Sequence, residues 1–173
     1  LAPPSDATEI EVTISANSKR IERLEPFPSR SADQFQHMPV LLKAVGQCTT
    51  DAISPAGPWL RFRGHLTRIS DNMFSGASNA FADASGHGRS VFADSSEELL
   101  AAIAKQYAAA GIAWIAVGDE NYGEGSSREH AAMSPRLLGA AAVIVRGFAR
   151  IHESNLKKQG VLPLVFVDPA DYE

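Results

Sequence analysis

The residues best suited to chemistry stand together in the stretch Gly118–His130, which reads GDENYGEGSSREH. Its two inner glycines permit a tight turn, and they are followed by Ser126, Ser127 and Arg128, where a helix should begin. Free N–H groups at a helix start, hydroxyl groups and a guanidinium together favour a bound carboxylate or phosphate. The stretch therefore predicts an anion-binding site.

Ser126 permits two interpretations. It can act as a catalytic base or nucleophile if Arg128, a helix N-terminus and backbone amides lower the cost of ionising its hydroxyl. It can equally be a helix cap, because Ser126 and Glu129 have the spacing of a capping box. The spacing favours neither interpretation over the other.

Two further residues, Asp51 and Arg63, lie in or just after a loop rich in helix breakers. The planar fork of Arg63 suits a carboxylate, although a surface cation or a structural ion pair fits the same pattern. Asp51 can orient an arginine or simply stabilise its own loop. These residues predict a polycarboxylate or phosphate pocket built from two loops, but they do not define a reaction.

Candidate metal ligands are scarce in the sequence. None of the five histidines has convincing metal-ligand spacing, so His65 and His130 are interpreted as structural or supporting groups. Cys48 is the single cysteine, which excludes an internal disulfide and a self-contained iron–sulfur cluster. The favoured interpretation of Cys48 is a buried bystander thiol. We therefore expect this chain alone to bind no metal.

The composition is ordinary for a globular protein. A chain of 173 residues can form one domain with a sizeable core and an extended arm. Its net charge of −4 provides no basic footprint for nucleic acid. No apolar run approaches the roughly 20 residues that a membrane-spanning helix needs. Leu1 in place of Met suggests a trimmed piece, from which any targeting segment would be lost.

The chain divides into a connector over residues 1–38 and a folded part over 39–173. Prolines and a polar run make the connector extended, apart from a short alternating strand over 10–14. In the folded part, strands are predicted over 40–45, 112–117, 141–145 and 161–166. Helices are predicted over 95–107, near 127–133 and over 149–158, and irregular loops over 48–59 and 67–94.

Local signals mark the ends of these helices. Ser95 and Glu98 can form a capping box, Gly111 and Gly160 are C-terminal stops, and Pro135 is expected to start a separate helical turn. Alternation of strands and helices predicts an α/β fold with a mostly parallel central sheet flanked by helices, preceded by the extended linker.

These motifs resemble those of the aconitate hydratase family, in its mitochondrial form. The resemblance covers roughly residues 21–173. It is carried by four segments: Cys48–Asp51, Gly57–Leu66, Gly118–Ala132 and Phe148–Gly160. It implies that residues 39–173 are an aconitase C-terminal swivel domain, truncated at its C-terminus, and that residues 1–38 are the linker before it.

The resemblance also implies a reaction and roles for particular residues. The reaction would be the interconversion of citrate and isocitrate through cis-aconitate. Ser126 corresponds to the ionised serine base. Arg63, Ser127 and Arg128 correspond to substrate-binding positions, and Asp51, grouped with them, corresponds to an active-site acid.

The same resemblance implies partners and a cofactor. The full-length enzyme would carry a 4Fe–4S cluster, held by three cysteines in other domains, and would bind a tricarboxylate substrate. We expect the isolated chain to be inactive without those cluster-bearing domains. The implied location is the mitochondrial matrix, with the cytoplasm as the alternative, and no membrane or nucleic-acid partner is expected.

Two positions depart from the family pattern, because Ala52 replaces a usual histidine and Pro55 replaces a small residue. The missing histidine bears on loop geometry or substrate preference. Two other functions also stay open. One is a small subunit of a related isopropylmalate or homoaconitate dehydratase, although the long linker argues against it. The other is a non-catalytic interaction module derived from an aconitase.

Overall fold

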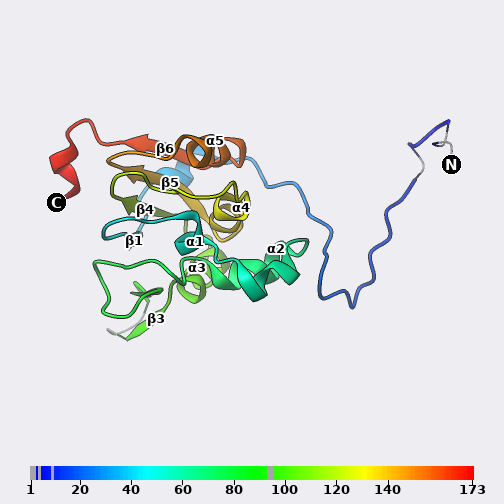
Figure 1. Ribbon diagram of the computed structural model, residues 1–173, viewed down its shortest axis with the longest axis horizontal. Coiled ribbons are helices and arrows are strands. Elements are labelled where there is room, and N and C mark those ends of the chain that lie inside the picture. Colours follow the sequence, from blue (N-terminus) through cyan, green and yellow to red (C-terminus); the bar gives the residue numbers. More distant parts are fainter. Residues whose placement is uncertain (1–2, 4, 9, 93–95) are drawn as a thin grey trace.

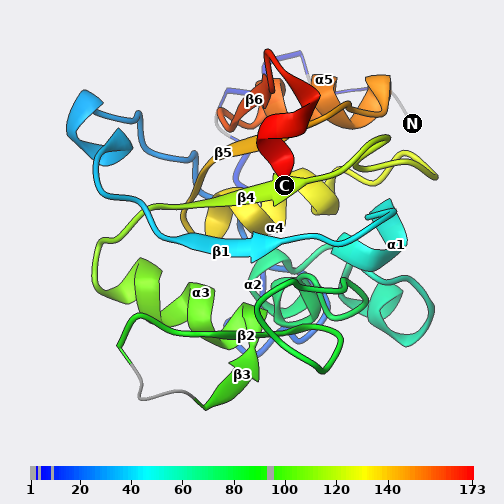
Figure 2. The ribbon, with the colours of Figure 1, turned by 90° about the vertical axis from the view of Figure 1, so that its left-hand side faces the viewer.

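The computed structural model describes residues 3, 5–8, 10–92 and 96–173. Within these residues, the central sheet has the strand order β1–β4–β5–β6 (Figure 2). Its strands are β1 (Val40–Lys43), β4 (Trp114–Gly118), β5 (Ala140–Val145) and β6 (Leu162–Val165). All neighbouring pairs are parallel. The predicted α/β fold with a parallel central sheet is confirmed.

Helices connect the strands and flank the sheet (Figure 1). They are α1 (Thr50–Ile53), α2 (Leu66–Ile69), α3 (Leu100–Ala109), α4 (His130–Leu137) and α5 (Arg150–Lys158). Helix α3 contacts β1, α4 contacts β5, and α5 contacts β6. Short 3-10 helices cover Ala32–Phe35, Gly57–Phe62, Ser70–Asn72 and Pro169–Tyr172. A separate antiparallel pair consists of β2 (His87–Arg89) and β3 (Glu97–Leu99). None of the helices in the described ranges is long and apolar enough to cross a membrane.

The core lies where the middle strands meet the helices. Leu42, Ala116 and Val143 lie on three adjacent strands and are almost inaccessible to solvent. A parallel strand covered on both faces is typically apolar throughout, which explains the run of alanines and valines in β5. At the edge of the sheet, β6 accommodates Pro163 because its outer side needs no backbone donor.

The N-terminal arm runs as an extended segment along and beyond the domain (Figure 1). Glu22 donates its backbone N–H to the carbonyl oxygen of Gly64 (2.9 Å). Further along, the Arg30 guanidinium donates to the carbonyl oxygen of Gly160 (3.3 Å), and Arg136 donates to that of Pro28 (2.5 Å). The arm is therefore attached at two places, while the domain boundary at residue 38 stays a prediction.

Several predictions of local structure are wrong. Residues 10–14 form no strand, because no described strand lies beside them to complete a hydrogen-bonded ladder. The predicted loop over 48–59 contains α1 and the start of a 3-10 helix. The irregular stretch 67–94 holds most of α2 and all of β2.

Two helix boundaries also differ from their predictions. Helix α3 begins at Leu100 rather than near 95, because Glu97–Leu99 pair with β2 as a strand. Ser95, the proposed cap, lies outside the described residues. Pro135 lies inside α4 instead of starting a new turn. Burial of Pro135 and its neighbours stabilises the helix despite the lost backbone hydrogen bond.

Candidate functional site

Three connecting segments meet at one edge of the sheet because each follows the carboxyl end of a strand. Residues 44–49 follow β1, residues 119–129 follow β4, and residues 146–149 follow β5. In a parallel sheet these ends lie side by side, and ligands bind in the crevice outside them. We call residues 119–129 the glycine loop.

Backbone hydrogen bonds fix the glycine loop between its two neighbours. Gly123 donates its N–H to the carbonyl oxygen of Cys48 (2.7 Å), and Thr50 donates to that of Glu124 (2.8 Å). On the other side, Tyr122 donates to the carbonyl oxygen of Gly147 (2.9 Å). The loop is therefore a rigid part of the sheet edge.

Both inner glycines of the loop are required by geometry. Gly123 has φ +80° and Gly125 has φ +123°, a region that side chains rarely adopt. A Cβ on Gly123 would collide with the ring of His152, and one on Gly125 would lie 2.7 Å from Oγ1 of Thr50. The loop can approach α1 and α5 this closely only because these positions have no side chain.

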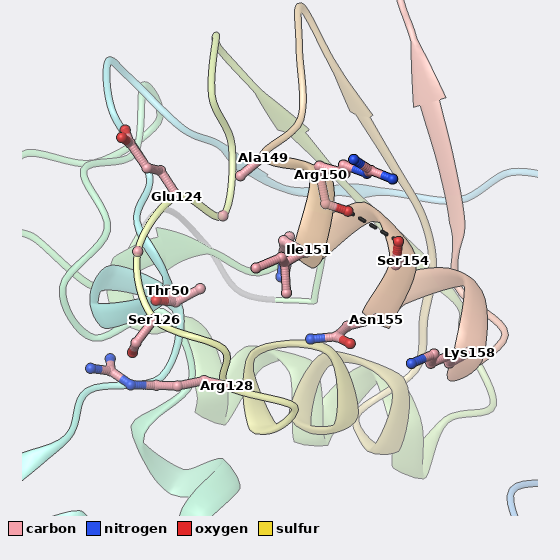
Figure 3. A pocket seen from close by; sticks show the side chains of 13 residues that line it. Thr50, Glu124, Ser126, Arg128, Ala149, Arg150, Ile151, Ser154, Asn155 and Lys158 are labelled. Carbon is pink, nitrogen blue, oxygen red and sulfur yellow. Dashed lines mark hydrogen bonds between the residues drawn. The ribbon is translucent and has the colours of Figure 1, made fainter.

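Ser126 is exposed and does not cap a helix. Helix α4 begins at His130, and its N-cap residue, Glu129, makes no side-chain capping hydrogen bond. The capping-box interpretation of Ser126 is therefore wrong, and so is the expectation that the helix begins beside it. The Ser126 hydroxyl instead lines a pocket (Figure 3).

Arg128 is held in place by Asp51. Its Nη2 donates to Oδ2 of Asp51 (3.0 Å), and its Nη1 pairs with Oδ1 of the same carboxylate. Nη1 also donates to the carbonyl oxygen of Ser54 (3.3 Å). These contacts leave the Nε–H and one N–H of Nη2 for a ligand. Hydrogen bonds from Arg128 also hold the pKa of Asp51 below its usual value.

The structure brings together only some of the predicted site residues. Ser126 and Arg128 line the same pocket, and Asp51 joins them through its bidentate pair. Ser127 and Arg63 are exposed and do not line this pocket. The turn at Arg63 is still tied to this region, because its carbonyl oxygen lies 2.9 Å from Nε2 of His130 at the start of α4.

The pocket has a volume of about 670 Å³ and a second wall that the sequence did not reveal. That wall is α5, from which Asn155 and Lys158 face the cavity opposite Ser126 and Arg128 (Figure 3). His152, also on α5, lines the same cavity. The segment Phe148–Gly160 carried part of the family resemblance, but no side chain in it was assigned to the site. The one signal in the sequence that could have indicated this wall is the spacing of His152, Asn155 and Lys158, which are polar and three residues apart on a predicted helix.

The ring of His152 packs beneath the glycine loop as an apolar side chain would. Its side chain is 1% exposed, neither ring nitrogen has a hydrogen-bond partner, and its ring lies 5.5 Å from that of Tyr122. Burial lowers the pKa of His152 from 6.5 to about 4. The imidazole is therefore neutral at physiological pH.

This burial predicts a pH dependence of stability. Because the folded-state pKa lies below the unfolded value, His152 stabilises the fold fully above about pH 6.5, and this is lost as pH falls towards 4. The loss should reach about 3 kcal/mol in the free energy of unfolding. Urea unfolding at several pH values measures this effect. Between pH 6.5 and 4, the free energy of unfolding should fall less steeply with pH for His152→Leu than for the exposed control His37→Gln. Equal slopes would contradict the assignment.

The residues of this chain do not fit an iron–sulfur cluster. Cys48 is buried, and burial raises the pKa of its thiol to about 12, so it stays protonated. A cluster needs several thiolates. Across residues 3, 5–8, 10–92 and 96–173, no group of three or more His, Cys, Asp or Glu side chains is placed to hold a metal ion.

The chain is similar to known proteins of one family. The family model described as the aconitase C-terminal domain matches residues 38–169. The mitochondrial aconitate hydratase of Gracilaria gracilis is 56% identical over 99% of this chain and 22% of its own length. That of Saccharomyces cerevisiae is 50% identical over the same shares. The chain thus spans about a fifth of the length of these relatives.

A solved structure also resembles this chain. It is a 3-isopropylmalate dehydratase from Methanocaldococcus jannaschii, 26% identical, with a TM-score of 0.41. The match covers 65% of this chain and 52% of that chain.

Proposed function

This chain belongs to the aconitase C-terminal domain family. We propose that it is the C-terminal domain of an aconitate hydratase that interconverts citrate and isocitrate. In this proposal the chain supplies the serine base and the arginines that bind substrate carboxylates. One observation carries it. The exposed Ser126 and the partly buried Arg128, whose guanidinium is held by Asp51, line the same pocket at the carboxyl edge of the sheet.

The proposed chemistry at this site is proton removal next to a carboxylate. Ionised Ser126 takes a proton from a substrate carbon through its Oγ, and the electron pair left behind spreads towards the adjacent carboxylate. Arg128 stabilises that charge, because a preoriented guanidinium acts most strongly where charge develops. Ser127, from the same loop, and Arg63, from the turn that contacts His130, bind the other carboxylates.

The remaining parts of the reaction lie outside this chain. We assign the 4Fe–4S cluster, its cysteine ligands and departure of the substrate hydroxyl to other domains of a longer polypeptide, which we call the parent enzyme. The relatives named above are mitochondrial aconitate hydratases. We accordingly propose the mitochondrial matrix as the location of the parent enzyme.

The proposal is tested by hydration of cis-aconitate, followed by absorbance, in the parent enzyme and in this chain alone. The parent enzyme should turn over, and the isolated chain should not, because it lacks the other half of the site. Turnover by the isolated chain would overturn this division of roles. Activity of the parent enzyme towards isopropylmalate but not cis-aconitate would favour the related dehydratase instead.

A further inference from the structure

Asn155 presents its side-chain amide to the pocket from the α5 wall. The residue is 7% exposed, yet its side-chain amide forms no hydrogen bond with any other described residue. Figure 3 shows this amide pointing into the hollow, towards the side occupied by Ser126 and Arg128. The small accessible part of this residue therefore includes the amide, whose donors are free to bind a group in the pocket.

The position of Asn155 is well defined. The next residue, Leu156, is completely buried, and its carbonyl accepts the N–H of Val161 at the end of α5 (3.0 Å). The Lys158 side chain lies one turn further along the same wall (Figure 3). An amide donor on a rigid helix, with a cation nearby, suits a carboxylate oxygen.

We propose that Asn155 is a further substrate-binding residue, whose side-chain amide donates a hydrogen bond to a substrate carboxylate across the pocket from Ser126. This inference rests on the proposed function. It adds a contact from α5, which is the opposite wall from the glycine loop.

The test uses Asn155→Asp in the parent enzyme, with Gln159→Glu as the matched control. Both changes convert an amide to a carboxylate within four positions of each other, but Gln159 lies away from the pocket. Asn155→Asp removes the donor and repels a substrate carboxylate. It should raise KM for citrate roughly ten- to a hundredfold, while kcat changes by less than about threefold. Gln159→Glu should leave both constants near the wild-type values.

The outcomes separate this inference from the proposed function. Absence of cis-aconitate turnover by the wild-type parent enzyme contradicts the proposed function itself. Wild-type turnover together with an unchanged KM for Asn155→Asp overturns only the role of Asn155.

A second measurement applies if Asn155→Asp does not fold. Citrate is titrated into this chain while the side-chain NH₂ signals are followed by NMR. The Asn155 signals should shift together with those of Arg128, whereas the Gln159 signals should not. Citrate that shifts the Arg128 signals and leaves those of Asn155 in place overturns the inference.

Discussion

Replacing Ser126 with alanine in the parent enzyme is expected to lower kcat for citrate by roughly 10²- to 10⁴-fold, the usual contribution of a positioned base. The hydroxyl is exposed in the pocket and has no structural role as a helix cap. Its removal should therefore leave KM and the free energy of unfolding close to the wild-type values. Steady-state kinetics and urea unfolding of the same preparations measure the two effects.

The matched control for this change is Ser85→Ala, at an exposed serine outside the pocket. It should match the wild type in kcat, KM and stability. A Ser126→Ala enzyme with wild-type kcat would show that another group removes the proton. A loss of kcat accompanied by an equal loss of stability would assign Ser126 a structural role instead.

Gly123→Ala is expected to destabilise the fold by about 3 kcal/mol or more and to abolish activity with it. The added Cβ would collide with the ring of His152, and residue 123 would keep a strained positive φ. Because the ring of His152 is 1% exposed and packs against the ring of Tyr122, the glycine loop must move away from α5. That movement carries Ser126 out of position, which urea unfolding and a cis-aconitate assay would both detect.

Gly111→Ala separates the two causes of this effect. Gly111 has a similar φ of +71°, but nothing lies within 4 Å of a Cβ built there. Gly111→Ala should lower the free energy of unfolding by only about 1 kcal/mol, from backbone strain alone, and should leave activity intact. Equal losses for Gly111→Ala and Gly123→Ala would show that contact with His152 contributes nothing.

Much of the sheet was predictable because its signals are local. The apolar runs that became β1, β4, β5 and β6 are short, continuous and bounded by breakers, as buried parallel strands are. Gly111 and Gly160 end α3 and α5 as expected, since both adopt the left-handed φ of a helix stop. Where such signals needed a distant partner, the predictions were wrong, as for the strand over 10–14.

The candidate site was predictable in its parts but not in its assembly. Turn chemistry and residue type indicated the glycine loop and made Ser126, Asp51 and Arg63 candidates, but they left Ser126 as either a base or a helix cap. Only the family resemblance implied a role for each of them. The capping-box alternative for Ser126 failed because tertiary packing, rather than local spacing, determines where α4 begins.

From the sequence by itself came the strand–helix order, the glycine turn and the chemical character of the loop, because each depends on neighbouring residues. Only the tertiary structure decided that Arg128 pairs with Asp51, that His152 lies under Gly123, and that Asn155 faces the pocket. These contacts join segments that are far apart in the chain. They exist because the parallel order β1–β4–β5 brings three carboxyl ends together, and no local pattern encodes that order.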